Sequence, residues 1–331
     1  MGLPVSDFVH LHVHSNLSFR DSINVIEDTA KRAAFLGQEY LALTDHGHAF
    51  GSVRHAYACR DAQIKPIFGM EAYEALVSDV ADGPEDDKYP AHLTLLVTNE
   101  TGWRNFCAIH SLSHQEPYAQ RRGPRLYPRV DRKMLEKYNE GLICMSACLG
   151  GKVQRPYLDD NKTDDQYITK QMDWYREVFE DRFYVELMGN TSDQRGILHH
   201  QRQICKKAKV RTVATNDVHY LTQDQGEEGG PHHVYSCSRF GNEPLHNRSP
   251  EDRNYGWYMS DEFYLKSADE MYDTGFTADE ITTSLEIAER CTASGFSPLT
   301  DLNFGIPPAP LDDIEDEMLF NMWQSSDQRV L

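Results

Sequence analysis

The sequence lacks two features that would place the protein in or across a membrane. Its 331 residues contain no run of about eighteen apolar residues, and its N-terminus has no basic segment followed by an apolar one. We therefore expect no membrane partner and predict a cytoplasmic protein. The seven cysteines are odd in number and scattered, without a Cys-x-x-Cys pair. This pattern argues against a disulfide framework or a structural zinc ribbon and favours reduced thiols.

Basic residues are scarce relative to acidic ones. The chain has 33 Lys and Arg against 52 Asp and Glu, a formal net charge of −19. A protein this acidic is not expected to hold duplex DNA by bulk electrostatics. Part of the acid can serve divalent cations, which would make a cleft locally positive for a phosphate. The alternative is that most of these carboxylates only keep the surface soluble.

Three histidines alternate with apolar residues in the first stretch of the chain, residues 8–15. Side chains alternate between the two faces of a strand, so His10, His12 and His14 are expected on one face and apolar residues on the other. Neighbouring imidazoles on one face can bind one divalent ion or two adjacent ions. The alternative is a strand whose histidines are only solvated or hydrogen-bonded.

Strand-like and helix-like segments alternate along the first two thirds of the chain. We predict strands at 8–15, 40–44, 66–71, 92–97, 141–146, 183–187 and 212–215, and helices at 24–36, 51–62, 101–114, 151–159, 164–180 and 192–208. Polar or Pro- and Arg-rich loops are expected at 78–90 and 115–129. Such alternation predicts an α/β fold with parallel strands and right-handed crossovers, and we expect a (β/α) barrel rather than an open sheet.

The regular alternation stops after Tyr220. Residues 221–257 are rich in Gly, Pro, Asn and charge, which predicts a long loop with at most one short helix. Helices are expected again at 267–273 and 278–291. We predict three parts, namely a barrel with a metal cluster at 1–222, a loop-rich helical extension of that domain at 223–300, and an extended connector at 301–331.

Candidate metal ligands follow the strands almost every time, where (β/α) barrels collect their functional groups. His92 is the exception, because it stands at the predicted start of its strand. The nine candidates are His12, His14, Asp21, His46, Glu71, His92, Cys148, Asp217 and His219.

Mixed imidazole and carboxylate donors suit zinc, manganese or iron, and nine donors exceed the need of one ion. We therefore expect two or three divalent ions, with Glu71 as the bridging ligand. Ions about 3.5 to 4 Å apart can hold a hydroxide at neutral pH and direct it at phosphorus. Two of the candidates also have a structural explanation that does not involve metal. His46 can belong to a turn or a helix cap, and Cys148 can be a small buried hydrophobic residue. Glu186 could also ligate, although a lone Glu in a strand more often faces solvent or pairs with a base.

Six segments carry a resemblance to a known family. They are residues 8–15, 43–47, 65–71, 146–151, 213–220 and 262–267. In their residues and in their order along the chain, they resemble the polymerase-and-histidinol-phosphatase (PHP) domain of bacterial DNA polymerase III alpha subunits, over roughly residues 7 to 310. The resemblance implies a distorted seven-stranded TIM-like barrel with up to three metal ions, and all nine family ligand positions fall on the nine candidates.

Family members with the full ligand set are similar to 3′→5′ proofreading exonucleases, whereas members that have lost ligands keep the domain as a scaffold. This sequence resembles the first kind. The implied function is a metal-dependent phosphodiesterase acting in DNA replication on single-stranded or frayed DNA 3′ ends. A hydroxide held by the cluster, with Asp21, Glu71 and His12, would attack the last phosphodiester. Arg20 and Lys152 are candidates to orient the phosphate; the family commonly has an acid at position 152.

Two other functions stay open. The paired catalytic aspartates of a polymerase palm do not occur in these residues, so polymerase activity is not expected from this chain alone, and the connector would lead toward a palm that is absent. The chain could instead be a non-catalytic structural or recruitment module that binds a separate palm-containing polypeptide. A small-molecule phosphatase similar to histidinol phosphatase is a weaker alternative, because the segments after residue 220 are polymerase-like.

Overall fold

The computed structural model describes residues 6–76, 79–80, 90–122, 125–158, 164–237 and 260–298. Almost all of them belong to one structural unit, Met1–Ser297. The predicted connector at 301–331 lies outside the described residues, as do most of the predicted loop at 78–90 and residues 238–259. Within the described ranges, no helix combines the length and apolar character needed to cross a bilayer.

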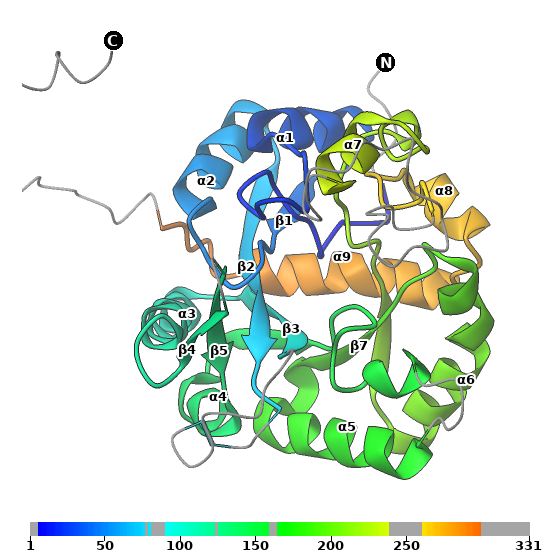
Figure 1. Ribbon diagram of the computed structural model, residues 1–331. Helices are drawn as coiled ribbons and strands as arrows, with labels where there is room; N and C mark the ends of the chain where they lie inside the picture. Colours follow the sequence, from blue (N-terminus) through cyan, green and yellow to red (C-terminus); the bar gives the residue numbers. More distant parts are fainter. Residues whose placement is uncertain are drawn as a thin grey trace, which may run out of the picture. The chain divides into compact units, whose positions relative to one another are not determined.

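A mixed sheet forms the centre of this unit (Figure 1). Its hydrogen-bonded order is β4-β5-β2-β3-β6-β7-β8, and β1 pairs with β2 off this path. The strands are β1 (Tyr40–Leu43), β2 (Lys65–Glu74), β3 (Ala91–Val97), β4 (Ala119–Arg122), β5 (Arg125–Val130), β6 (Leu142–Met145), β7 (Phe183–Leu187) and β8 (Arg211–Ala214).

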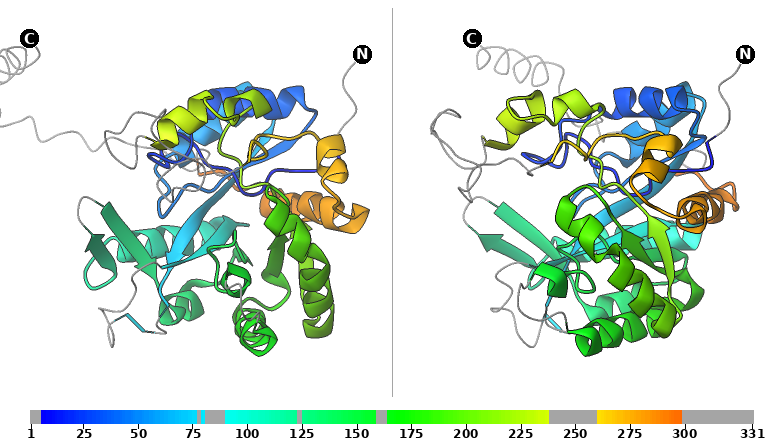
Figure 2. Two further views of the ribbon diagram at one scale, coloured as in Figure 1. Left: turned by 45° about the vertical axis from the view of Figure 1, so that its right-hand side comes forward. Right: turned by 90° about the vertical axis from the view of Figure 1, so that its right-hand side faces the viewer.

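Helices surround the sheet in the views of Figures 1 and 2. They are α1 (Ile26–Phe35), α2 (Ser52–Asp61), α3 (Glu100–Ser113), α4 (Arg132–Tyr138), α5 (Asp165–Phe179), α6 (Ser192–Ala208), α7 (Pro231–Cys237), α8 (Ala268–Asp273) and α9 (Ala278–Thr292), with 3₁₀ turns η1 (Arg155–Leu158), η2 (Glu180–Arg182) and η3 (Gln223–Gln225). The helix predicted at 151–159 is wrong except for the turn η1. The two helices predicted after residue 260 are confirmed as α8 and α9.

Residues 9–14 run between β1 and the chain that follows β8. On one side Ala42 N donates to His10 O (3.1 Å), and on the other His14 N donates to Val218 O (2.9 Å) and Val218 N to His12 O (3.0 Å). The expected regular strand is replaced by a single bridge between Val13 and Val218. Neighbours on both sides and side-chain hydroxyls share the backbone hydrogen bonds, so no continuous ladder forms in this described segment. The segment nevertheless links β1 to the chain that follows β8, as a barrel requires.

Strand β3 departs from the predicted parallel arrangement. It pairs antiparallel with both β2 and β6, and Glu74 at the end of β2 lies opposite Ala91 at the start of β3. The chain therefore reverses direction between β2 and β3 instead of crossing over. As a consequence, the start of β3 lies at the same edge of the sheet as the end of β2, and this places His92 opposite Tyr73.

A β-hairpin replaces the loop predicted at 115–129. Strands β4 and β5 pair antiparallel, and β5 adds parallel to the end of β2 through Tyr73 and Glu74. The proline and arginine residues of this segment led to the prediction of a loop. A hairpin at the margin of a sheet can nevertheless contain a proline. The buried Arg129 side chain fixes the base of the hairpin by donating to Pro117 O (3.0 Å) and Tyr118 O (3.1 Å).

Part of the apolar core packs around residues 9–11. One cluster joins Val9 and Leu11 to Ala42 of β1 and Val213 of β8, and α9 adds Ile287. Helix α9 contacts both β8 and β2. Apolar side chains of residues 8–14 thus anchor this segment in the core, and the histidines between them are held in fixed positions.

Candidate metal centre

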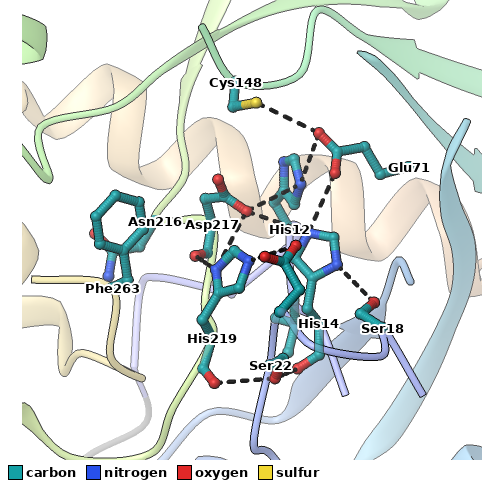
Figure 3. A network of polar contacts seen from close by, with 12 residues as sticks. His12, His14, Ser18, Ser22, Glu71, Cys148, Asn216, Asp217, His219 and Phe263 are labelled. Carbon is teal, nitrogen blue, oxygen red and sulfur yellow. Dashed lines mark hydrogen bonds and ion pairs between the residues drawn. The ribbon is translucent and has the colours of Figure 1, made fainter. Parts of the chain in front are cut away.

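The fold brings all nine candidate ligands together. Figure 3 shows part of this cluster, with His12, His14, Glu71, Cys148, Asp217 and His219 labelled. His12 and His14 come from the segment inside the barrel, and Asp21 precedes α1. The others follow or lie on strands: His46 after β1, Glu71 on β2, His92 on β3, Cys148 after β6, and Asp217 with His219 after β8.

Glu71 contacts four imidazoles with its two carboxylate oxygens. Oε1 lies 2.9 Å from His92 Nδ1 and 3.5 Å from His12 Nε2. Oε2 lies 2.8 Å from His46 Nδ1 and 3.3 Å from His14 Nε2. The side chain of Glu71 is 1% exposed. It therefore has the position expected of a ligand shared between ions.

Two aspartates face Glu71 across the cluster. Asp21 Oδ2 lies 2.6 Å from His46 Nε2 and 3.4 Å from His219 Nε2. Asp217 Oδ1 lies 3.2 Å from His14 Nε2. Asp217 has a φ of +45°, a conformation that residues other than glycine seldom adopt and that is common at functional sites.

Cys148 lies at one side of the cluster. Its Sγ is 3.4 Å from His92 Nδ1 and 3.6 Å from Glu71 Oε1, and it accepts a hydrogen bond from Gly150 N (3.4 Å). Burial, followed by the charge of Glu71, raises the pKa of this thiol well above its ordinary value. Ligation by Cys148 therefore requires a cation strong enough to displace its proton.

The inward-facing donor atoms fit a cation. Five of them are buried, make no hydrogen bond outside the cluster within the described residues, and face one another at 2.8 to 3.3 Å: His12 Nε2, His14 Nε2, His46 Nδ1, Glu71 Oε2 and Asp217 Oδ1. Buried polar atoms that contact only one another in this way are placed to coordinate a divalent ion. Ligand atoms lie within 4.8 Å of one another in three groups, which share members: His14 with His46 and His219, His12 with His14 and Glu71, and His46 with Glu71 and His92.

In the cluster, neighbouring charges raise the pKa of His12 and lower the pKa of Glu71. Burial lowers the pKa of His12, but the carboxylates around it, led by Glu186, hold that pKa well above its usual range. Burial raises the pKa of Glu71, but the imidazoles around it, led by His92, hold that pKa well below its usual range. The metal-free centre is thus charged on both sides, and ligation at His12 Nε2 releases a proton.

Glu186 occupies a role that the sequence did not reveal. Its Oε2 lies 2.8 Å from His12 Nδ1 and accepts from Thr215 Oγ1 (2.8 Å), while its Oε1 accepts from Thr94 Oγ1 (2.7 Å) and Ala147 N (2.8 Å). These contacts place Glu186 behind His12, where it directs Nε2 of that imidazole into the cluster. The only signal in the sequence is an acid within the apolar strand β7.

Asp45 fixes His14 through a hydroxyl. Ser18 Oγ lies 3.0 Å from His14 Nδ1 and donates to Asp45 Oδ1 (2.7 Å). Asp45 also accepts from the backbone and hydroxyl of Ser15, both at 2.7 Å. Both imidazoles of the first segment therefore have their outer nitrogen occupied and their inner nitrogen available.

Replacement of Glu186 by glutamine is expected to weaken metal binding by about 10- to 100-fold, the usual effect of losing a carboxylate behind a histidine ligand. The amide keeps the size of the side chain but loses the charge that faces His12 Nδ1. Titration of the metal-free protein with zinc or manganese against a chelating dye measures the change. Glu177→Gln, an exposed substitution on α5, is the matched control, and equal affinity in both variants would show that Glu186 does not orient His12.

Three residues near the cluster have other contacts. His10 Nε2 lies 2.9 Å from Lys266 O, outside the cluster. Lys152 is 4% exposed, and its Nζ lies 2.9 Å from Glu74 Oε1, which argues against the predicted role of its ammonium in orienting phosphate. Arg20 precedes Asp21 with a φ of +66°, and its guanidinium lies 5.6 Å from the Phe19 ring. Arg20 remains a phosphate-orienting candidate.

Comparison with known families agrees with this geometry. A family model described as the PHP domain matches residues 10–190, more than half of the chain. This chain belongs to the PHP domain family. The resemblance and the α/β barrel class predicted from the sequence are thereby confirmed.

Similar proteins place the PHP domain within larger chains. The chain is 32% identical over 319 residues to DNA polymerase III subunit alpha of Borreliella burgdorferi, covering 96% of this chain and 26% of that protein. It is 34% identical over 289 residues to the same subunit of Treponema pallidum, covering 86% of this chain and 23% of that protein. This chain therefore spans about a quarter of the length of these curated relatives.

Solved structures of other proteins match part of the chain. A two-domain protein from Bacteroides vulgatus containing a predicted PHP-like metal-dependent phosphoesterase has 16% identity and a TM-score of 0.40, over 66% of this chain and 55% of that one. An amidohydrolase from Chromobacterium violaceum has 13% identity and a TM-score of 0.42, over 64% of this chain and 87% of that one.

Proposed function

We propose that this PHP domain is a metal-dependent phosphodiesterase, a 3′→5′ exonuclease of the proofreading type that acts on single-stranded or frayed DNA ends during replication. One observation carries the proposal: all nine ligand-type residues converge, and five of their buried donor atoms face only one another within the described chain. Two or three divalent ions, zinc, manganese or iron, would occupy the three overlapping donor groups.

The ions, when bound, supply activation of water and stabilisation of the leaving oxygen. The protein fixes their positions. Glu71 is shared between donor groups, and Glu186 orients His12 from behind. Access comes from one side, because the side chains of His92 and His46 are 24% and 16% exposed whereas that of His12 is 0% exposed. A terminal phosphodiester would therefore approach past His46 and His92, with Arg20 as the candidate cation beside it.

Metal analysis together with digestion of a 3′-labelled single strand tests the proposal. We expect manganese- or zinc-stimulated nucleotide release that falls to background in Asp21→Asn and in His12→Ala, because each variant removes a donor from the cluster. Asp173→Asn, an exposed substitution on α5, is the matched control and should leave release unchanged. Release that persists in both purified ligand variants would contradict the proposal.

A second candidate function is a structural or recruitment module that binds a separate polymerase polypeptide, with metals only stabilising the barrel. It is favoured by the size of the relatives, since this chain covers only 23% to 26% of them. Co-purification with a palm-containing polypeptide, without nucleotide release from any DNA end, would favour this function over the nuclease.

A further inference from the structure

The β4–β5 hairpin belongs to one of the basic stretches of this acidic chain. Residues 118–130, which include β4 and β5, contain no acidic residue, whereas the whole chain has a net charge of −19. The segment contains four arginines, at positions 121, 122, 125 and 129. The proposed nuclease function gives this basic hairpin no role so far.

The hairpin is joined to the metal centre by aromatic contacts. The Tyr127 ring on β5 lies 5.2 Å from the Tyr73 ring, and the Tyr73 ring lies 5.7 Å from His46 and 5.6 Å from His92. Those two histidines are among the ligands that reach solvent. The hairpin therefore stands beside the open side of the cluster.

The loop that carries His46 packs directly on the same surface. A Cβ atom at Gly47 would lie 2.8 Å from the Tyr73 ring and 2.9 Å from Pro128 Cγ, and Gly47 has a φ of +66°. Only glycine allows this close approach without strain. Residues of β5 and the ligand loop after β1 are thus fixed relative to one another.

Arg121 differs from many exposed arginines of the protein. Arg54 donates to Glu27 and Arg211 donates to Glu286, each at 2.7 Å, so their charges are neutralised locally. Arg121 is exposed, and no carboxylate in the described part of the chain pairs with it. It lies on β4, the terminal strand of the sheet path. Figures 1 and 2 show this hairpin at the margin of the sheet, on the side away from α6.

We propose that the β4–β5 hairpin binds the DNA strand that leads to the metal centre, with Arg121 contacting a backbone phosphate within a few nucleotides of the 3′ end. The inference rests on the proposed nuclease function, which requires a strand beside the cluster. An unneutralised guanidinium attracts phosphate, whereas the net charge of the chain repels DNA elsewhere. The contact is independent of base identity, because it involves the backbone alone.

Binding of fluorescein-labelled oligothymidine in the presence of a chelator tests the hairpin separately from cleavage. We expect Arg121→Glu to weaken binding about five- to tenfold at low salt and to lower the salt dependence by about one phosphate contact, with Arg121→Gln in between. Lys207→Glu makes the same charge change at an exposed site on α6, far from the hairpin, and should have a clearly smaller effect. Cleavage of thymidine 5′-p-nitrophenyl phosphate, which has no leading strand, should be unchanged in Arg121→Glu.

Equal weakening by Arg121→Glu and Lys207→Glu would overturn the assignment, because it would reflect net charge alone. Unchanged affinity for oligothymidine in Arg121→Glu would also overturn the assignment. The role of Arg121 would then be to prevent the edge strand β4 from pairing with another chain. If the wild type digests DNA and Arg121→Glu binds oligothymidine with wild-type affinity, the DNA-binding role of the hairpin is refuted and the nuclease function is still supported. If the wild type binds oligothymidine through Arg121 but releases no nucleotide, the nuclease function is refuted and the DNA-binding role of the hairpin is supported. A wild type that does not bind oligothymidine refutes the DNA-binding role of the hairpin.

Discussion

A Glu71→Gln variant is expected to lose bound divalent metal and to release nucleotides from DNA 3′ ends at no more than about one hundredth of the wild-type rate. Loss of an outer partner of a ligand typically weakens metal binding or activity about 10- to 100-fold, so loss of a shared ligand should have a larger effect. Both oxygens of Glu71 take part, since Oε1 faces His92 and Oε2 faces His46 at 2.9 and 2.8 Å. The amide has the same shape but offers one weak donor oxygen instead of two charged ones.

Elemental analysis of purified Glu71→Gln and the 3′-label assay measure the two effects separately. Circular dichroism establishes that the variant is folded, and Glu177→Gln makes the same chemical change at an exposed position. Full metal content together with a wild-type rate in Glu71→Gln would show that Glu71 is not the bridging ligand. Full metal content with a low rate would place its role in the reaction rather than in holding the ions.

Glu74→Leu is expected to lower the free energy of unfolding by about 3 to 5 kcal/mol, because it leaves a buried ammonium without its partner. The Lys152 and Glu74 side chains are 3% and 0% exposed, with Nζ and Oε1 2.9 Å apart. The hydroxyl of the buried Tyr175 also donates to Glu74. Denaturant unfolding of the wild type and the variant measures the difference.

Removal of both charges should recover most of the lost free energy of unfolding. The double variant Glu74→Leu with Lys152→Met is expected to unfold within about 2 kcal/mol of the wild type, the remainder reflecting the Tyr175 hydroxyl left without its acceptor. A double variant as unstable as Glu74→Leu alone would mean that packing, and not the unpaired ammonium, causes the loss. Nucleotide release by a folded double variant should stay near wild type, since Lys152 points its charge at Glu74 rather than at the cluster.

Patterns local in sequence predicted much of the fold. Helix α6 has the predicted bounds, 192–208, because Thr191 and Gln194 form a capping box at its start and Lys209 adopts a left-handed conformation at its end. Most of the nine candidate ligands follow strands, so they could be expected to meet at one edge of the sheet, whereas His92 at the start of β3 and Asp21 before α1 do not follow this rule. His12 and His14 alternate with core residues, so their positions followed from the period of a strand.

Features that depend on partners distant in sequence were not predicted. The direction of β3 is set by its pairing with β2 and β6, and nothing in residues 91–97 specifies it. Arg129 looks like a surface residue until the carbonyls of Pro117 and Tyr118 are known to face it. The contacts of Glu186 and Lys152 could not be read from the sequence for the same reason, because their partners, His12 and Glu74, come from other strands or segments.

The bridge between Val13 and Val218 also sets when the centre can form during protein synthesis. His12 and His14 leave the ribosome about two hundred residues before Asp217 and His219, and closing so long a loop is a late step of folding. A nascent chain that ends before residue 217 has only part of the donor set and holds metal weakly. Under the proposed ligand set, tight metal uptake would therefore require that synthesis has passed His219 and that residues 12–14 have paired with Val218.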